Sequence, residues 1–194
     1  MPRREFGLMG YIGEAIVEYW LKNVEYPDPA YSIVYQIKPI DYDARGGPYL
    51  DFGVIKNGRV HAIYEVKSQD YIPDKSFVLN PALKAIWDHK NDFAGFVNQD
   101  GREFKSTSDL EAYLVLLVCP NMDGVKRIGR QNLKQVILFS EVFEDLEKHD
   151  RTDYLKCVHG AFDKDVGKVI ETLKNPKQGK SKRQEFLRQR EACR

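Results

Sequence analysis

The spacing of apolar residues changes along the first half of the chain and predicts a series of short elements. Residues 10–23 repeat apolar positions every three or four residues, the period of an amphipathic helix. Tyr31–Lys38 is rich in β-branched and aromatic residues, which favour strands. Tyr49–Lys56 and Arg59–Lys67 alternate apolar with polar residues around Asn57-Gly58, a strong signal for a β-hairpin. The first half therefore predicts one helix and then three strands, of which the last two form a hairpin.

The second half predicts a helix, a buried strand and further elements. Pro81–Asp92 is expected to be helical, because proline suits the first turn of a helix. The unbroken apolar run Ala112–Cys119 is typical of a strand that is buried on both faces. A strand at Lys134–Phe139, a helix capped by Ser140 and one more helix within residues 151–172 are expected to follow. The predicted fold class is α/β, with a central mixed β-sheet flanked by helices.

The alternation of apolar and polar residues on the two strands predicts how they pair in the hairpin. A two-residue turn at Asn57-Gly58 would pair Phe52 with Ile63 and place the two apolar rows on opposite faces. A three-residue turn, Lys56-Asn57-Gly58, pairs Phe52 with Ala62 and keeps both rows on the core side. We therefore predict the three-residue turn. The apolar rows are Leu50, Phe52 and Val54 on the first strand and Val60, Ala62, Tyr64 and Val66 on the second.

Three side chains that suit phosphodiester chemistry lie on the other face of the hairpin. In the predicted register Asp51 is the diagonal neighbour of Glu65, roughly 5–8 Å away between Cβ atoms. Lys67 follows two residues later on the same face. Carboxylates suit Mg²⁺, with Mn²⁺ as a substitute, and the ion keeps positions for water and for substrate phosphate oxygens. The lysine can orient or deprotonate the attacking water while the ion offsets charge on the phosphate.

The same residues resemble the signature of the PD-(D/E)XK nuclease superfamily, which includes restriction endonucleases, Holliday-junction resolvases and RecB-like repair nucleases. Pro48 and Asp51 open the motif, and Glu65-Val66-Lys67 follows Asp51 after thirteen intervening residues. The resemblance implies that Asp51 and Glu65 bind the metal, that Val66 contributes its backbone carbonyl, and that Lys67 serves the attacking water. It also implies a restriction endonuclease-like αβββαβ core over about residues 8–120.

Two further residues enter through this resemblance. Many members carry a glutamate on the first helix that completes the metal site, and Glu14 occupies the corresponding region. Gln69 resembles polar residues that some members place near the scissile phosphate, although RecB-like members carry their glutamine further on, in the next helix. A second departure is the position of Pro48, which stands three residues before Asp51 rather than directly before it.

Simpler explanations exist for these residues. Charges that alternate on a solvent-facing strand are common. On a helical wheel Glu14 aligns with Glu18 and Lys22, which is the pattern of an exposed strip of ion pairs. The prediction is a metal-dependent nuclease, an endonuclease that hydrolyses DNA; the alternative is a non-catalytic nucleic-acid-binding or assembly module that retains the fold. Substrate structure, sequence preference and pathway stay open, and so does a homodimer, which a double-strand cutter would usually need.

Composition and charge bear on the location and on the ends of the chain. The 42% hydrophobic and 30% charged residues are typical of a globular protein. The sequence holds no apolar run long enough to span a bilayer and opens with an amphipathic helix, so a cytoplasmic protein with no membrane partner is expected. Residues 175–194 carry seven basic and two acidic side chains. We predict a nuclease-like domain at 1–174 and a basic tail at 175–194, which either grips phosphates or is a solvated, flexible terminus.

Overall fold

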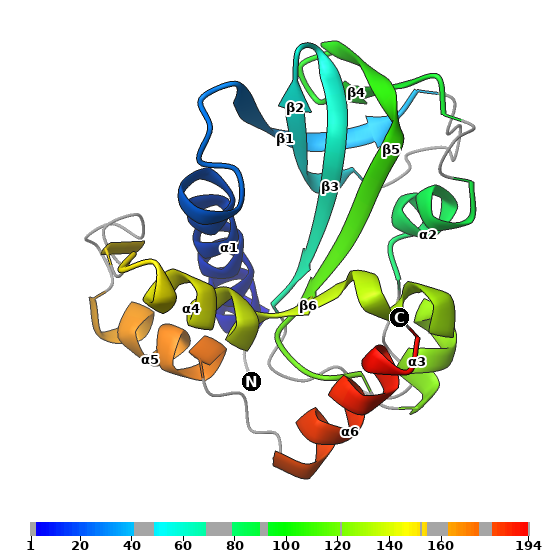
Figure 1. Ribbon diagram of the computed structural model, residues 1–194. Helices are drawn as coiled ribbons and strands as arrows, with labels where there is room; N and C mark the ends of the chain where they lie inside the picture. The colour runs from blue at the N-terminus through cyan, green and yellow to red at the C-terminus, as the bar shows by residue number, and fades with distance from the viewer. Residues whose placement is uncertain are drawn as a thin grey trace. The chain divides into compact units, whose positions relative to one another are not determined.

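The chain has a mixed α/β fold in which helices flank a six-stranded sheet, the fold class that the sequence predicts (Figure 1). The computed structural model describes residues 3–40, 49–68, 79–89, 93–120, 122–151, 153–154, 163–174 and 180–193. The helices are α1 (Arg3–Trp20), η1 (Leu21–Glu25, a π-helix), α2 (Pro81–Asp88), α3 (Met122–Ile128), η2 (Arg130–Gln135, a 3₁₀-helix), α4 (Phe139–Lys148), α5 (Asp163–Lys174) and α6 (Lys180–Glu191). The strands are β1 (Tyr31–Pro39), β2 (Leu50–Lys56), β3 (Arg59–Lys67), β4 (Gly95–Asn98), β5 (Glu103–Leu116) and β6 (Val136–Leu138).

Most predicted elements are present, and the differences have local causes. The strand expected at Ala112–Cys119 is the end of the longer β5, whose first half is polar and was therefore not recognised. Its partner β4 was not predicted because four residues are too few for an alternating pattern to be evident. The helix cap predicted at Ser140 is wrong. Helix α4 starts at Phe139 instead, because the Glu141 carboxylate reaches back to accept the N–H of Leu138 at 2.8 Å.

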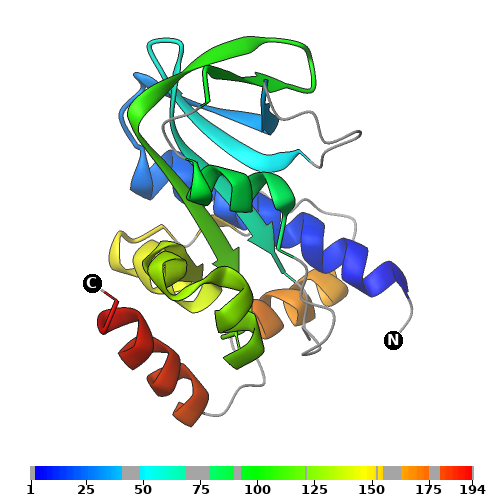
Figure 2. The same ribbon diagram turned by 90° about the vertical axis from the view of Figure 1, so that its right-hand side faces the viewer.

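Five strands form a closed circuit in the order β1, β2, β3, β5, β4, in which β4 also pairs with β1. Strands β1, β2 and β3 run antiparallel to their neighbours in sequence. Two hydrogen bonds give the relative direction of β3 and β5: the N–H of Lys105 donates to the carbonyl of Gly58, and the N–H of Leu117 donates to the carbonyl of Lys67. Because the residue numbers of both partners increase from the first bond to the second, the two strands are parallel. Figure 2 shows the long, curved ribbon of β5. Strand β3 therefore has a neighbour on both sides, and its polar residues do not lie on a sheet edge.

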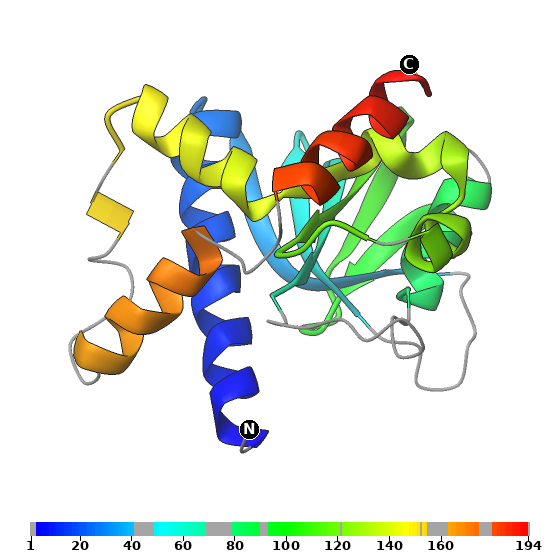
Figure 3. The same ribbon diagram turned by 90° about the horizontal axis from the view of Figure 1, so that it is seen from below.

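By packing, the chain divides into two compact units. The first unit comprises residues 1–25, 66–77 and 115–194, and the second comprises residues 26–65 and 78–114. In the first unit α4 and α5 lie beside α1, as Figure 3 shows, and Trp20 Nε1 donates to Asp145 at 3.2 Å. In the second unit α2 is held to β5 by Trp87, whose Nε1 donates to the carbonyl of Ala112 at 2.8 Å. Trp87 is buried, so it is a core residue.

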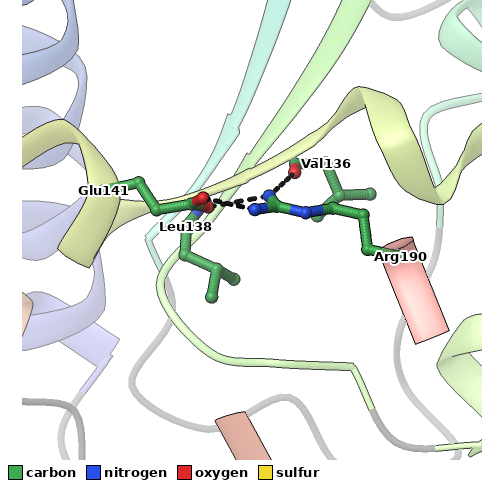
Figure 4. Close-up of polar contacts among 4 residues, drawn as sticks. All are labelled: Val136, Leu138, Glu141 and Arg190. Atoms are coloured by element: carbon green, nitrogen blue, oxygen red, sulfur yellow. Dashed lines mark hydrogen bonds and ion pairs between the residues drawn. The ribbon is translucent and has the colours of Figure 1, made fainter. Parts of the chain in front are cut away.

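Part of the predicted tail is a helix that packs within the first unit. Phe186 of α6 is buried. The guanidinium of Arg190 donates to both carboxylate oxygens of Glu141, at 3.0 and 2.6 Å, and to the carbonyl of Val136 at 2.9 Å (Figure 4). The same carboxylate accepts the N–H of Leu138. Arg190 is thus engaged with the protein, and this bidentate contact anchors α6 to β6 and α4.

Among the described residues, no helix has both the length and the apolar character that a membrane crossing requires.

Candidate functional site

The turn between β2 and β3 differs from the predicted one. Lys56 pairs with Arg59 and Ile55 with Val60, so the loop contains only Asn57 and Gly58. Both loop residues have positive φ, 51° and 71°, as a type I′ turn requires. The prediction of a three-residue turn is therefore wrong, because the preference of Asn-Gly for the two-residue turn prevails.

A β-bulge next to this turn restores the alternation. The register shifts between Val54 and Ile55, so that Ile55 pairs with Val60 but Val54 pairs with Ala62, leaving His61 as the extra residue. Beyond the bulge Phe52 lies opposite Tyr64, and both side chains are buried. The predicted common face is confirmed for Phe52, Val54, Ala62 and Tyr64, although a bulge rather than a longer turn produces it. The prediction is wrong for Val60, which pairs with Ile55 instead of Val54 because it lies on the turn side of the bulge.

The same register fixes where the two candidate carboxylates stand on the two strands. The recorded pairs of β2 and β3 end with Phe52 and Tyr64, and Asp51 and Glu65 are the next residue on each strand. Because side chains alternate along a strand, both lie on the face opposite to that of Phe52 and Tyr64. Asp51 and Glu65 therefore share one face of the hairpin within the second unit.

Burial separates this face from an ordinary solvent-facing strand. Glu65 is only 2% exposed, and Ile63, its neighbour on the same face, is fully buried. Asp51 is partly exposed. A buried carboxylate is costly unless it is paired, hydrogen-bonded or bound to a metal. The simpler explanation of alternating surface charges therefore does not apply to Glu65.

Asn80 holds the carboxylate of Glu65. Its Nδ2 donates to Glu65 Oε2 at 3.1 Å and to the carbonyl of Tyr49 at 3.3 Å. Its Oδ1 accepts the N–H of Ala82 at 3.0 Å, which makes Asn80 the N-cap of α2. The sequence signals the cap, because an asparagine precedes Pro81 at a helix start. It carries no signal for the contact with Glu65, which joins residues fifteen positions apart.

Lys67 and Val66 end the strand that carries Glu65. Lys67 is two residues beyond Glu65 on β3, so strand alternation directs both side chains to the same face. Lys67 is partly exposed, and its carbonyl accepts the N–H of Leu117 at 3.1 Å. The side chain of Val66 is buried and points to the opposite, apolar face.

Helix α1 lies against the residue that follows Lys67. A Cβ added at Gly13 would be 2.7 Å from Ser68 Cβ, so only glycine allows this approach within the first unit. Glu14 is the next residue along α1 and is partly exposed. The ion pair between Lys22 and Glu18 predicted by the exposed-strip alternative is present. The role of Glu14 as a metal ligand stays a prediction.

The predicted site residues thus fall into three groups. Asp51 and Glu65 belong to the second unit, and Glu14, Val66 and Lys67 belong to the first unit. Gln69 and Pro48 lie outside the described residues.

The donor set fits Mg²⁺ better than metals that need several protein ligands. Within the described ranges, no group of three or more histidine, cysteine, aspartate or glutamate side chains is placed to hold a metal ion. Mg²⁺ is usually bound through only one or two carboxylates and completes its octahedron with water and substrate phosphate oxygens. Asp51 and Glu65 meet that requirement, whereas Zn²⁺ would need at least three protein ligands.

Comparisons of the chain with protein-family models, with curated proteins and with solved structures found no match.

Proposed function

We propose that this protein is a divalent-metal-dependent nuclease of the PD-(D/E)XK type that hydrolyses phosphodiester bonds in DNA. The observation that supports it most is the pair formed by Asp51 and Glu65, with Glu65 only 2% exposed. Mg²⁺ is usually bound in proteins through one or two carboxylates, and it takes water and substrate phosphate oxygens at its other positions. The two carboxylates would supply that donor set.

Three residues of the chain would have separate roles in the hydrolysis. Asp51 and Glu65 would hold Mg²⁺, which supplies charge neutralisation at the phosphate and lowers the pKa of a coordinated water. The ammonium group of Lys67, on the same face of β3 as Glu65, would orient the attacking water and offset the charge that develops on the phosphate. As the water oxygen bonds to phosphorus, the water would release a proton to solvent and the bond between phosphorus and the leaving oxygen would break. The leaving oxygen would then take up a proton from solvent.

The order of elements also supports the proposal. Helix α1 is followed by β1, β2 and β3, then by α2 and β5, which is the αβββαβ order of the restriction endonuclease-like core with β4 inserted. The proposed catalytic aspartate lies on β2, the glutamate and the lysine lie at the end of β3, and β3 has β2 and β5 as neighbours. This order of elements resembles that of the family core.

A cleavage assay tests the proposal. Plasmid, linear duplex and single-stranded DNA are incubated with the wild-type chain in Mg²⁺ or Mn²⁺, beside Glu65→Gln and Lys67→Ala. Each variant is expected to lose about 10²–10⁴-fold in rate, the range typical of groups that act on the reacting atoms. Matched controls are Glu103→Gln and Lys105→Ala, which change exposed residues of β5 and should leave the rate unchanged.

Thermal unfolding of each variant separates loss of activity from loss of fold. Wild-type protein that cleaves none of the three substrates with either ion, or a Glu65→Gln variant as active as wild type, would contradict the proposal. Binding of DNA without cleavage would instead support the non-catalytic module.

A further inference from the structure

We propose that Asn80 is a positioning residue that holds Glu65 in the rotamer required for metal binding, and so sets the affinity of the site for its divalent cation. This inference rests on the proposed function. It assigns a role to a residue on α2 that the motif does not contain.

The chemistry of the helix cap shows that asparagine does more here than capping requires. An N-cap needs only a side-chain oxygen, and serine or aspartate caps a helix about as well as asparagine. At Asn80 the oxygen caps α2 through the N–H of Ala82, while the amide NH₂ group faces Glu65 and the carbonyl of Tyr49. The donor half of the side chain therefore acts on these two partners, and only asparagine supplies both halves at this length.

The two partners of the amide are both connected to the metal-binding carboxylates. One is Glu65 itself, and the other is the carbonyl of Tyr49, two residues before Asp51. A single buried side chain, 6% exposed, thus ties the Glu65 carboxylate and the start of β2 to the same helix end. The positive end of the α2 dipole also favours a negative charge at this place.

Holding a ligand in place matters because a glutamate has several rotatable bonds. Groups that hydrogen-bond to a ligating carboxylate fix its orientation, and their loss typically weakens metal affinity or activity by about 10–100-fold. The contact at 3.1 Å between Asn80 Nδ2 and Glu65 Oε2 is of this kind. Asn80 acts through Glu65 and does not touch the reacting atoms.

The test compares Asn80→Ser with Asn132→Ser in the full chain. Serine keeps a capping oxygen at position 80 but cannot reach Glu65. Asn132 is a matched control, since it is 7% exposed and donates its amide to a backbone carbonyl, that of Ile128, at 3.1 Å. Mn²⁺ binding is measured by calorimetry, and the rate of DNA cleavage is followed as Mg²⁺ is raised.

We expect Asn80→Ser to bind Mn²⁺ about 10–100-fold more weakly than wild type, and Asn132→Ser to bind it unchanged. Cleavage by Asn80→Ser should recover towards the wild-type rate at saturating Mg²⁺, which a merely misfolded variant would not do. Wild-type Mn²⁺ affinity in Asn80→Ser, together with loss of binding in Asp51→Asn, would overturn the inference and leave the proposed function standing. Absence of Mn²⁺ binding in the wild type would overturn both.

Discussion

The close contact between α1 and the end of β3 leads to a quantitative prediction for Gly13→Ala. A Cβ at this position would lie 2.7 Å from Ser68 Cβ, 3.0 Å from Ser68 Oγ and 3.0 Å from Phe139 Cζ. Non-bonded carbon atoms prefer a separation of about 3.5–4.0 Å, so the new contact is roughly 1 Å too short. The Cβ of Ser68 is fixed by its backbone and cannot rotate away. Either α1 or the end of β3 must therefore move.

Gly10→Ala is the matched control for the magnitude. Both glycines lie within α1, so each substitution gains up to about 1 kcal/mol of helix propensity. A Cβ at Gly10 would meet only Ser68 Oγ, at an ordinary 3.8 Å, so Gly10→Ala should stabilise the protein. Gly13→Ala adds an overpacking cost of about 1–3 kcal/mol. The difference between the two variants cancels the propensity and should equal that cost.

Chemical and thermal unfolding of the two variants measure this difference. For a chain of this size, about 1 kcal/mol corresponds to roughly 2–4 °C in Tm, so the melting temperatures should differ by several degrees. Stabilisation of Gly13→Ala to the same extent as Gly10→Ala would refute the reasoning, because it would mean that α1 does not lie against Ser68.

Three further changes probe other parts of the chain. Arg190→Lys should lose the bidentate contact with Glu141, lower the free energy of unfolding by about 1–3 kcal/mol and speed proteolysis of α6, and an unchanged digestion rate would argue against this anchor. Gly58→Ala should cost about 1–2 kcal/mol in urea unfolding, because φ of 71° is unfavourable for alanine; equal midpoints would contradict the type I′ turn. The hydrogen bond from Lys174 to Tyr154 raises the pKa of Lys174 above its ordinary 10.5, so its small stabilisation is complete below that pH and is lost as pH rises through the higher folded-state pKa. Lys174→Gln should therefore be slightly less stable than wild type at pH 7 and should approach it at high pH, whereas a gap that stays constant with pH would exclude this linkage.

The hairpin of β2 and β3 shows what the alternation of apolar and polar residues can predict. Alternation along β2 and β3 predicted both strands, and the side-chain period of two predicted that Asp51, Glu65 and Lys67 share a face. The shared face does not depend on the length of the turn, for which the prediction was wrong. A three-residue turn and a two-residue turn with a bulge at His61 both preserve the alternation, so the pattern does not distinguish them.

The tertiary structure corrected the pairing that the pattern predicted. The bulge sets Phe52 opposite Tyr64 rather than opposite Ala62, and Asp51 and Glu65 are the next residues beyond that pair. The Asn57-Gly58 signal was the correct local guide to the turn. No residue type in the sequence marks the position of the bulge.

The sequence by itself determined the strands, the main helices and the shared face, because these depend on side-chain periodicity between residues close together in the chain. Only the tertiary structure decided that Glu65 is buried, that Asn80 holds its carboxylate and that Gly13 packs on Ser68. Each of these contacts joins residues at least fifteen positions apart. Their free energy depends on the packing of whole elements, which periodicity along a single strand or helix does not encode.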